Sequence, residues 1–115
     1  MSVESIFRKP LLTATIGERN VTSVEVREIR FKPNQETGLH KHPCPVIGYI
    51  AEGTAVFQIE GQPERELPAG SAFYEPAGTI IRRFDNASSS EDMTFIACYL
   101  LDGEQELIEM LPPDK

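Results

Sequence analysis

Residues 46–60 read VIGYIAEGTAVFQIE, and this stretch decides the fold. It predicts two strands, at residues 46–51 and 54–60, that are joined through Glu52-Gly53. Glycine suits the turn between them, because it adopts the positive φ of a hairpin turn at no steric cost. The stretch therefore predicts β structure in the middle of the chain.

The same pattern of short strands and turns continues on both sides of this stretch. Further strands are predicted at residues 21–31, 79–84 and 93–101, further turns at 60–63 and 68–70, and a polar loop at 86–92. No window has a convincing helical period, and the best candidate, 104–111, could equally be a final strand. Regularly spaced strands without a linker or repeat predict one all-β domain, a sandwich or a barrel, over residues 1–115.

The composition is that of an ordinary soluble globular protein with an acidic balance of charge. Eleven basic residues against eighteen acidic ones give a net charge of -7, which disfavours binding to nucleic acid and to anionic membranes. No apolar run has the length of a signal peptide or a membrane span. Cys44 and Cys98 lack a C-x-x-C spacing, so we expect reduced thiols and a cytoplasmic protein.

Both histidines of the chain, His40 and His42, stand in the segment GLHKHP at residues 38–43. Side chains at positions i and i+2 of a strand point to the same face, so the two imidazoles are predicted to converge. Imidazole nitrogens are common ligands of zinc, iron and similar metals. Two ligands are too few for firm binding, so a metal site needs further donors. Without them the pair would be two half-exposed strand residues.

The spacing of the histidines belongs to a longer pattern that includes Asn34 and Gly53. This pattern resembles the first motif of the cupin family: glycine, five residues, His-x-His, three or four residues, glutamate, six residues, glycine. His40, His42 and Gly53 match the motif. Asn34 stands at the first glycine, which it can replace because asparagine tolerates positive φ, and Val46 stands at the glutamate.

The segment from Gly70 to Asp85 resembles the second motif of the same family. That motif is glycine, five residues, proline-x-glycine, two residues, histidine, three residues, asparagine. Gly70, Pro76 and Gly78 match in spacing, whereas Ile81 stands at the histidine and Asp85 at the asparagine. The resemblance, which runs over residues 21–101, implies a small one-domain cupin of the conserved-barrel type. Its fold would be an RmlC-like jelly-roll β-barrel with one end open onto an interior pocket.

The resemblance also implies a metal site, from which this sequence departs. In the family, the histidines and glutamate of the first motif and the histidine of the second bind a divalent metal. His40 and His42 carry over to that role, but Val46 and Ile81 cannot act as ligands. A divalent ion (Fe, Mn, Zn or Ni) is therefore expected to be weakly held or absent. No other cofactor is expected, and no residue is assigned a catalytic role.

Glu75 is the candidate for a replacement ligand. It shares a strand face with Phe73 by alternation, and a phenylalanine suits the barrel interior, so Glu75 is expected to point inward. A buried carboxylate needs a partner, because desolvation of the charge alone is costly. Glu75 could complete a facial triad with the two histidines, pair with Arg82 or Arg83 in a structural ion pair, or lie exposed.

The residues expected to line the pocket are Cys44, Val46, Phe73 and Ile81. Cys44 continues the parity of the two histidines, although the prolines on either side of it can interrupt the alternation. Val46 and Ile81 would make the pocket partly apolar. A barrel of this size can hold one small molecule in its interior.

Three functions remain open on this basis. The chain could be a small-molecule-binding cupin with a degenerate metal site. It could be a metal-dependent enzyme, of dioxygenase or isomerase type, that uses His40, His42 and a noncanonical ligand, or a structural or regulatory dimer with a vestigial site. Since cupins commonly pair by exchange of an N-terminal strand, a homodimer is expected. Residues 11–16 (LLTATI) offer an apolar strand for that exchange, and residues 104–111 are an accessory segment.

Overall fold

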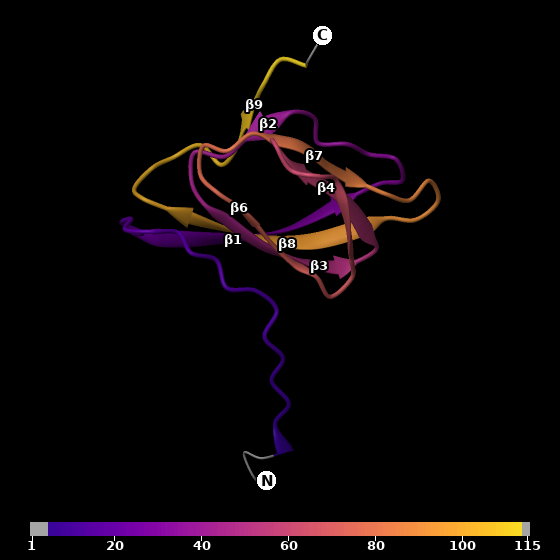
Figure 1. Cartoon of the computed structure of the whole chain (residues 1–115), viewed down its shortest axis with the longest axis horizontal. Helices are drawn as coiled ribbons and strands as arrows, with labels where there is room; N and C mark the ends of the chain where they lie inside the picture. Colours follow the sequence, from indigo (N-terminus) through magenta and orange to yellow (C-terminus); the bar gives the residue numbers. More distant parts are fainter. Residues whose placement is uncertain (1–4, 114–115) are drawn as a thin grey trace.

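The computed structural model describes residues 5–113, which form nine β-strands and no α-helix (Figure 1). The chain passes repeatedly between two sheets, so strands that are consecutive in sequence often lie in different layers. The strands are β1 (Ser23–Phe31), β2 (His40–Lys41), β3 (Val46–Glu52), β4 (Thr54–Ile59), β5 (Arg65–Pro68), β6 (Ala72–Glu75), β7 (Ile81–Asn86), β8 (Met93–Leu101) and β9 (Glu109–Met110).

The two sheets face each other and enclose the core. One has the strand order β1-β8-β3-β6, and the other has the order β5-β4-β7-β2-β9. All the strand pairs in them are antiparallel. Figure 1 shows β1, β8 and β3 in one layer and β2, β4 and β7 in the other. This arrangement is a jelly roll, and the prediction of an all-β jelly-roll fold is confirmed.

The stretch 46–60 forms the two predicted strands, β3 and β4, but these strands do not pair with each other. β3 pairs with β6 and β8, while β4 pairs with β5 and β7. Gly53, between them, has a φ of 82°, and the chain turns a corner there from one sheet to the other. A side chain at residue 53 would press against the backbone of Asp92 and Met93. Glycine is thus required for the positive φ and for the close approach.

The core between the sheets is built largely from phenylalanine rings. Phe57, Phe73, Phe84 and Phe95 pack in tilted and edge-on pairs, with ring centroids 4.7–6.1 Å apart. Gly48 lies so close to the ring of Phe73 that a Cβ at residue 48 would overlap that ring. The absence of a side chain at residue 48 therefore makes room for the Phe73 ring beside β3.

The two accessory segments differ from each other in structure. Residues 11–16 were expected to form a strand, but they form none and run away from the barrel as an extended segment (Figure 1). A strand requires a neighbouring strand for its hydrogen bonds, and the described part of the chain provides none there. The segment 104–111 was predicted to be either a helix or a final strand. Glu109 and Met110, near its end, form the strand β9, which pairs with His40 and Lys41.

Three smaller expectations concern backbone conformation, thiols and membrane spans. Asn34 has a φ of 63°, the positive value that its place in the first motif predicts. Cys44 and Cys98 are free thiols. Within residues 5–113, no helix has the length and apolar character that a membrane span requires.

Candidate metal centre

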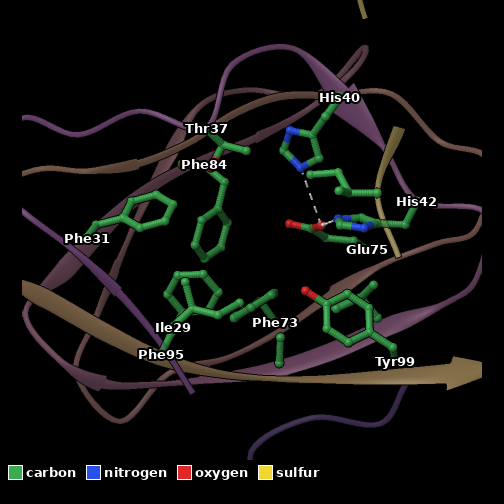
Figure 2. A pocket seen from close by; sticks show the side chains of 13 residues that line it. Ile29, Phe31, Thr37, His40, His42, Phe73, Glu75, Phe84, Phe95 and Tyr99 are labelled. Atoms are coloured by element: carbon green, nitrogen blue, oxygen red, sulfur yellow. Dashed lines mark hydrogen bonds and ion pairs between the residues drawn. The ribbon is translucent and has the colours of Figure 1, made fainter. Parts of the chain in front are cut away.

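The two histidines converge from the end of the short strand β2. His40 belongs to β2 and His42 follows its last residue, so the alternation carries over the strand end. Both side chains are buried, with 2% and 5% of their residue surface exposed. Their ring centroids lie 5.0 Å apart, with an angle of 81° between the ring planes. Figure 2 shows both rings directed at the same point inside the barrel.

Backbone carbonyl groups hold both rings in a defined tautomer. Nδ1 of His40 lies 2.7 Å from the carbonyl oxygen of Gly38, and Nδ1 of His42 lies 2.7 Å from that of Leu107. A carbonyl oxygen only accepts hydrogen bonds, so each Nδ1 carries the proton and donates it. Each Nε2 atom is consequently the free nitrogen, and it is the one that faces the barrel interior.

Glu75 brings a carboxylate to the same point from the neighbouring sheet. It is the last residue of β6, and its Cα pairs with that of Val46 on β3. The side chain is buried, with 3% of the residue surface exposed. Its Oε1 atom lies 2.5 Å from Nε2 of His42 and 3.8 Å from Nε2 of His40. Dashed lines in Figure 2 mark both contacts.

The short distance between Glu75 and His42 requires a positive charge between them. Because Nδ1 of His42 carries the proton, a neutral His42 would direct the lone pair of Nε2 at the carboxylate oxygen. Two electron-rich atoms repel each other at this distance unless a proton or a cation lies between them. Burial alone would lower the pKa of His42 and raise the pKa of Glu75. For His42, the hydrogen bond and charge of Glu75 and the carbonyl of Leu107 outweigh burial and raise the pKa. For Glu75, the hydrogen bonds and charges of the two histidines outweigh burial and lower the pKa.

The three side chains fit a divalent metal ion by their chemistry and their spacing. Two imidazole nitrogens and one carboxylate oxygen lie within 4.8 Å of one another, and both kinds of atom are common ligands of divalent metals. Two histidines and one carboxylate are a ligand set of metalloenzymes that leaves coordination positions open. The hydrogen bonds to Nδ1 are the outer contacts that histidine ligands usually make. His40, His42 and Glu75 are therefore the residues that would hold a metal.

A cavity of about 240 Å³ opens beside these three side chains. Figure 2 shows the rings of Phe31, Phe84 and Phe95 across the cavity from the histidines and Glu75. Ile29 and Ile108 also contribute apolar surface to the lining. Small-molecule sites commonly combine an apolar wall with a few convergent polar groups, and this cavity has that composition.

The other predicted pocket residues divide into two pairs. Val46 and Phe73 line the cavity. Cys44 and Ile81 are not among the lining residues, and both are completely buried in the hydrophobic core. For Cys44, the flanking prolines interrupt the alternation that begins at the histidines, since the residues after β2 form a bend. Ile81 pairs with His40 across β2 and β7, but its side chain packs into the core.

The arginines that were alternative partners of Glu75 pair with other carboxylates. Arg82 lies 3.3 Å from Glu60. Arg83 lies 2.8 Å from Glu64 and 2.8 Å from Asp85. Glu75 itself is neither exposed nor directed at this surface, and its contacts are with the two histidines.

The residues at this site that sequence reasoning missed include Tyr99, Leu107 and Ile108. Tyr99 lines the cavity, and its position could have been predicted from the alternation within residues 93–101, which directs every second side chain inward. Leu107 contributes its carbonyl oxygen to His42, and a backbone atom leaves no signal in the residue type. Ile108 lines the cavity from a segment with no clear periodicity.

Comparison with known proteins gives matches over most of the chain. Residues 27–99 match the family model of the cupin domain. The β-alanine degradation protein BauB of Pseudomonas aeruginosa is 34% identical over 85 residues, which cover 72% of this chain and 87% of BauB. The dimethylsulfoniopropionate lyase DddQ of Ruegeria pomeroyi is 33% identical over 72 residues, which are 63% of this chain but only 33% of DddQ.

Solved structures support the same fold. The crystal structure of DddQ from Ruegeria pomeroyi matches with a TM-score of 0.68 and 22% identity, over 81% of this chain and 45% of that one. A cupin-like protein from Thermotoga maritima matches with a TM-score of 0.66 and 23% identity, over 78% of this chain and 65% of that one. Given the match of residues 27–99 to the family model, the chain belongs to the cupin domain family.

Proposed function

We propose that this cupin binds a small carboxylate ligand in its barrel, next to a divalent metal ion held by His40, His42 and Glu75. One observation carries the proposal: the three donor groups converge, buried, at the edge of an otherwise apolar cavity. Bound there, a divalent ion would polarise an oxygen atom of the ligand as a Lewis acid. The apolar wall would contact the remainder of the ligand.

The names of two relatives support a carboxylate as the ligand. DddQ is named a dimethylsulfoniopropionate lyase, and BauB is named a β-alanine degradation protein. Both names contain a three-carbon acid with a substituent on its β carbon. Among the described residues, no lysine or arginine lines the cavity, so the carboxylate of such a ligand would find its positive partner at the metal.

Catalysis by a metal-dependent enzyme is the second candidate function. It is favoured by the number of donors, because three protein ligands leave positions for a ligand and for water, as catalytic sites do and structural sites do not. The protein would supply three things: donors of fixed orientation, a cavity that excludes bulk water, and apolar surface against which a ligand is held.

Metal content of protein purified without an affinity tag tests the proposal. We expect Fe, Mn, Zn or Ni near one equivalent after reconstitution, and loss of that metal in His42→Ala. His42→Ala is matched by Lys41→Ala, which changes the neighbouring, partly exposed residue of β2 and should leave metal content unchanged. Wild-type protein that takes up no divalent metal would contradict the proposal and favour a vestigial site.

We also propose that the chain forms a homodimer through its N-terminal segment. Phe7 is 84% exposed, and Ile6, Leu11 and Leu12 are exposed as well. β1 lies at the edge of its sheet, with Val26 61% exposed. Apolar side chains on an extended segment and on an edge strand are the features that a second chain would cover.

Light scattering coupled to size-exclusion chromatography tests the dimer. The wild type is expected to have the mass of two chains, and Leu11→Asp with Leu12→Asp is expected to have the mass of one. Glu18→Gln, in the same segment, serves as a control that should leave the dimer intact. A monomeric wild type at micromolar concentration would contradict the proposal.

A further inference from the structure

Tyr99 places a hydroxyl group in the cavity on the same side as the three donors. It lies on β8, where the inward side chains Phe95, Ala97 and Tyr99 alternate with outward ones, and 7% of its surface is exposed. Its ring centroid lies 6.0 Å from that of His42. Figure 2 shows the hydroxyl oxygen directed toward the cavity and toward Glu75.

The strand register explains why there is room between Tyr99 and the carboxylate. Val46 pairs with Tyr99 on one side and with Glu75 on the other, so the three residues lie in one row across β8, β3 and β6. Neighbouring strands are about 4.8 Å apart, which puts Tyr99 and Glu75 about 10 Å apart at their Cα atoms. The short side chain of Val46 between them leaves open the space that a glutamate would occupy, and this space is part of the cavity.

The hydroxyl of Tyr99 differs from the other polar groups of the lining in having no partner. Each Nδ1 atom of the two histidines donates to a carbonyl oxygen, and each Nε2 atom faces Glu75. Thr37 donates its hydroxyl proton to the carbonyl oxygen of Phe84. Within residues 5–113, the hydroxyl of Tyr99 makes no hydrogen bond. No fully buried side-chain nitrogen or oxygen of the described residues lacks a partner, so the unpaired Tyr99 hydroxyl is accessible from the cavity that it lines and is available to a ligand.

We propose that the Tyr99 hydroxyl donates a hydrogen bond to an oxygen of the ligand that is bound at the metal, and so selects ligands with an acceptor there. The inference rests on the proposed function and adds the residue that orients the ligand. A carboxylate has two oxygens, one for the metal and one for Tyr99, whereas a ligand with a single donor atom satisfies only the metal.

The surroundings of Tyr99 favour a donor rather than a base. Burial raises the pKa of the phenol, and the negative charge of Glu75 raises it further, although Arg27 opposes the shift. A phenol has an ordinary pKa of about 10, so it carries a proton that it can donate at neutral pH. A phenol that donates to a charged oxygen makes one of the stronger hydrogen bonds of proteins.

The test compares Tyr99→Phe with wild type, using Mn²⁺ as the metal, propionate as the carboxylate and imidazole as a metal ligand without oxygen. Calorimetry and electron paramagnetic resonance of Mn²⁺ report each binding step without any assay of activity. We expect unchanged affinity for Mn²⁺, affinity for propionate about tenfold weaker or more, and unchanged affinity for imidazole. Tyr49→Phe is the matched control, since Tyr49 is an exposed tyrosine of β3.

Each other outcome overturns the inference in a recognisable way. Equal affinity of Tyr99→Phe and wild type for propionate would show that the hydroxyl does not contact the ligand. Weaker binding of Mn²⁺ by Tyr99→Phe would assign the residue to the metal site instead. Since the hydroxyl makes no hydrogen bond within the protein, Tyr99→Phe should keep the thermal midpoint of the wild type. A lower midpoint would indicate that the hydroxyl has a structural role instead. Wild-type protein that binds Mn²⁺ but neither small ligand would overturn the ligand proposed above together with the role of Tyr99.

Discussion

Replacement of Glu75 by glutamine is the most direct test of the metal centre. The change keeps the shape of a buried side chain but removes the anionic donor from a set of two imidazoles and one carboxylate. Loss of a group that merely orients a ligand costs about 10- to 100-fold in metal affinity. Loss of a direct ligand should therefore cost about 100-fold or more, which corresponds to about 2.7 kcal/mol.

The effect can be measured as thermal stability that depends on metal. At 100 times its Kd, a metal stabilises the wild type by about 2.7 kcal/mol, which for a chain of 115 residues raises Tm by about 10 °C. At the same concentration, a site 100-fold weaker gains about 0.4 kcal/mol, or about 2 °C. Glu60→Gln, the same change at an exposed carboxylate that pairs with Arg82, should keep the full rise.

An exchange variant sharpens the interpretation. Residues 46 and 75 are cross-strand partners, and both line the cavity, so Val46→Glu combined with Glu75→Val returns a carboxylate to the same region from β3. We expect this variant to recover most of the rise in Tm. If Glu75→Gln alone keeps the wild-type rise, the reasoning that Glu75 is a metal ligand is refuted.

Three further predictions concern the same site and its support. Ile81→His should strengthen metal binding, as measured by competition with a chelator, because residue 81 is the cross-strand partner of His40 and such partners project from the same face of the sheet, although the isoleucine itself packs into the core. The pKa of His42 is raised above 6.5, so protonation of its Nε2 should weaken metal binding as the pH falls through that raised pKa. Without metal, the ion pair with Glu75 should instead stabilise the fold at lower pH and be lost as the pH rises through the same range, which thermal melts at several pH values would show. Gly48→Ala should lower Tm by displacing the Phe73 ring, at a cost of about 1–3 kcal/mol, whereas the same change at Gly61, whose surroundings are open, should act only through its backbone conformation.

The fold could largely be predicted because strands leave periodic patterns and turns leave glycines. The strand at 93–101 was predicted with its observed bounds. The pairing of the strands on either side of Gly53 could not be predicted, since a glycine with positive φ serves a hairpin and a corner between sheets equally well. The segment 11–16 has the composition of a strand, but a strand also depends on a neighbour that the sequence does not specify.

The site could be predicted only where residue type and alternation sufficed. Spacing alone predicted that His40 and His42 converge. For Glu75, alternation left three alternatives, and the register that sets it beside Val46 and opposite the histidines depends on which strands are neighbours. Cys44 follows the parity of the histidines in sequence, but the bend at its prolines removes it from the cavity lining.

Because main-chain carbonyl groups hold the two imidazoles, the centre is insensitive to side-chain substitutions at the acceptor residues but sensitive to changes in the length of the chain. The acceptors are the main-chain oxygens of Gly38 and Leu107, so no change of side chain can delete them. An insertion or deletion between β8 and Leu107 would instead move that oxygen away from His42 while leaving both histidines and Glu75 in the sequence. Surface connections usually tolerate such length changes, but this one should not. In related chains, the length of this connection would therefore be as informative about an intact centre as the histidines themselves.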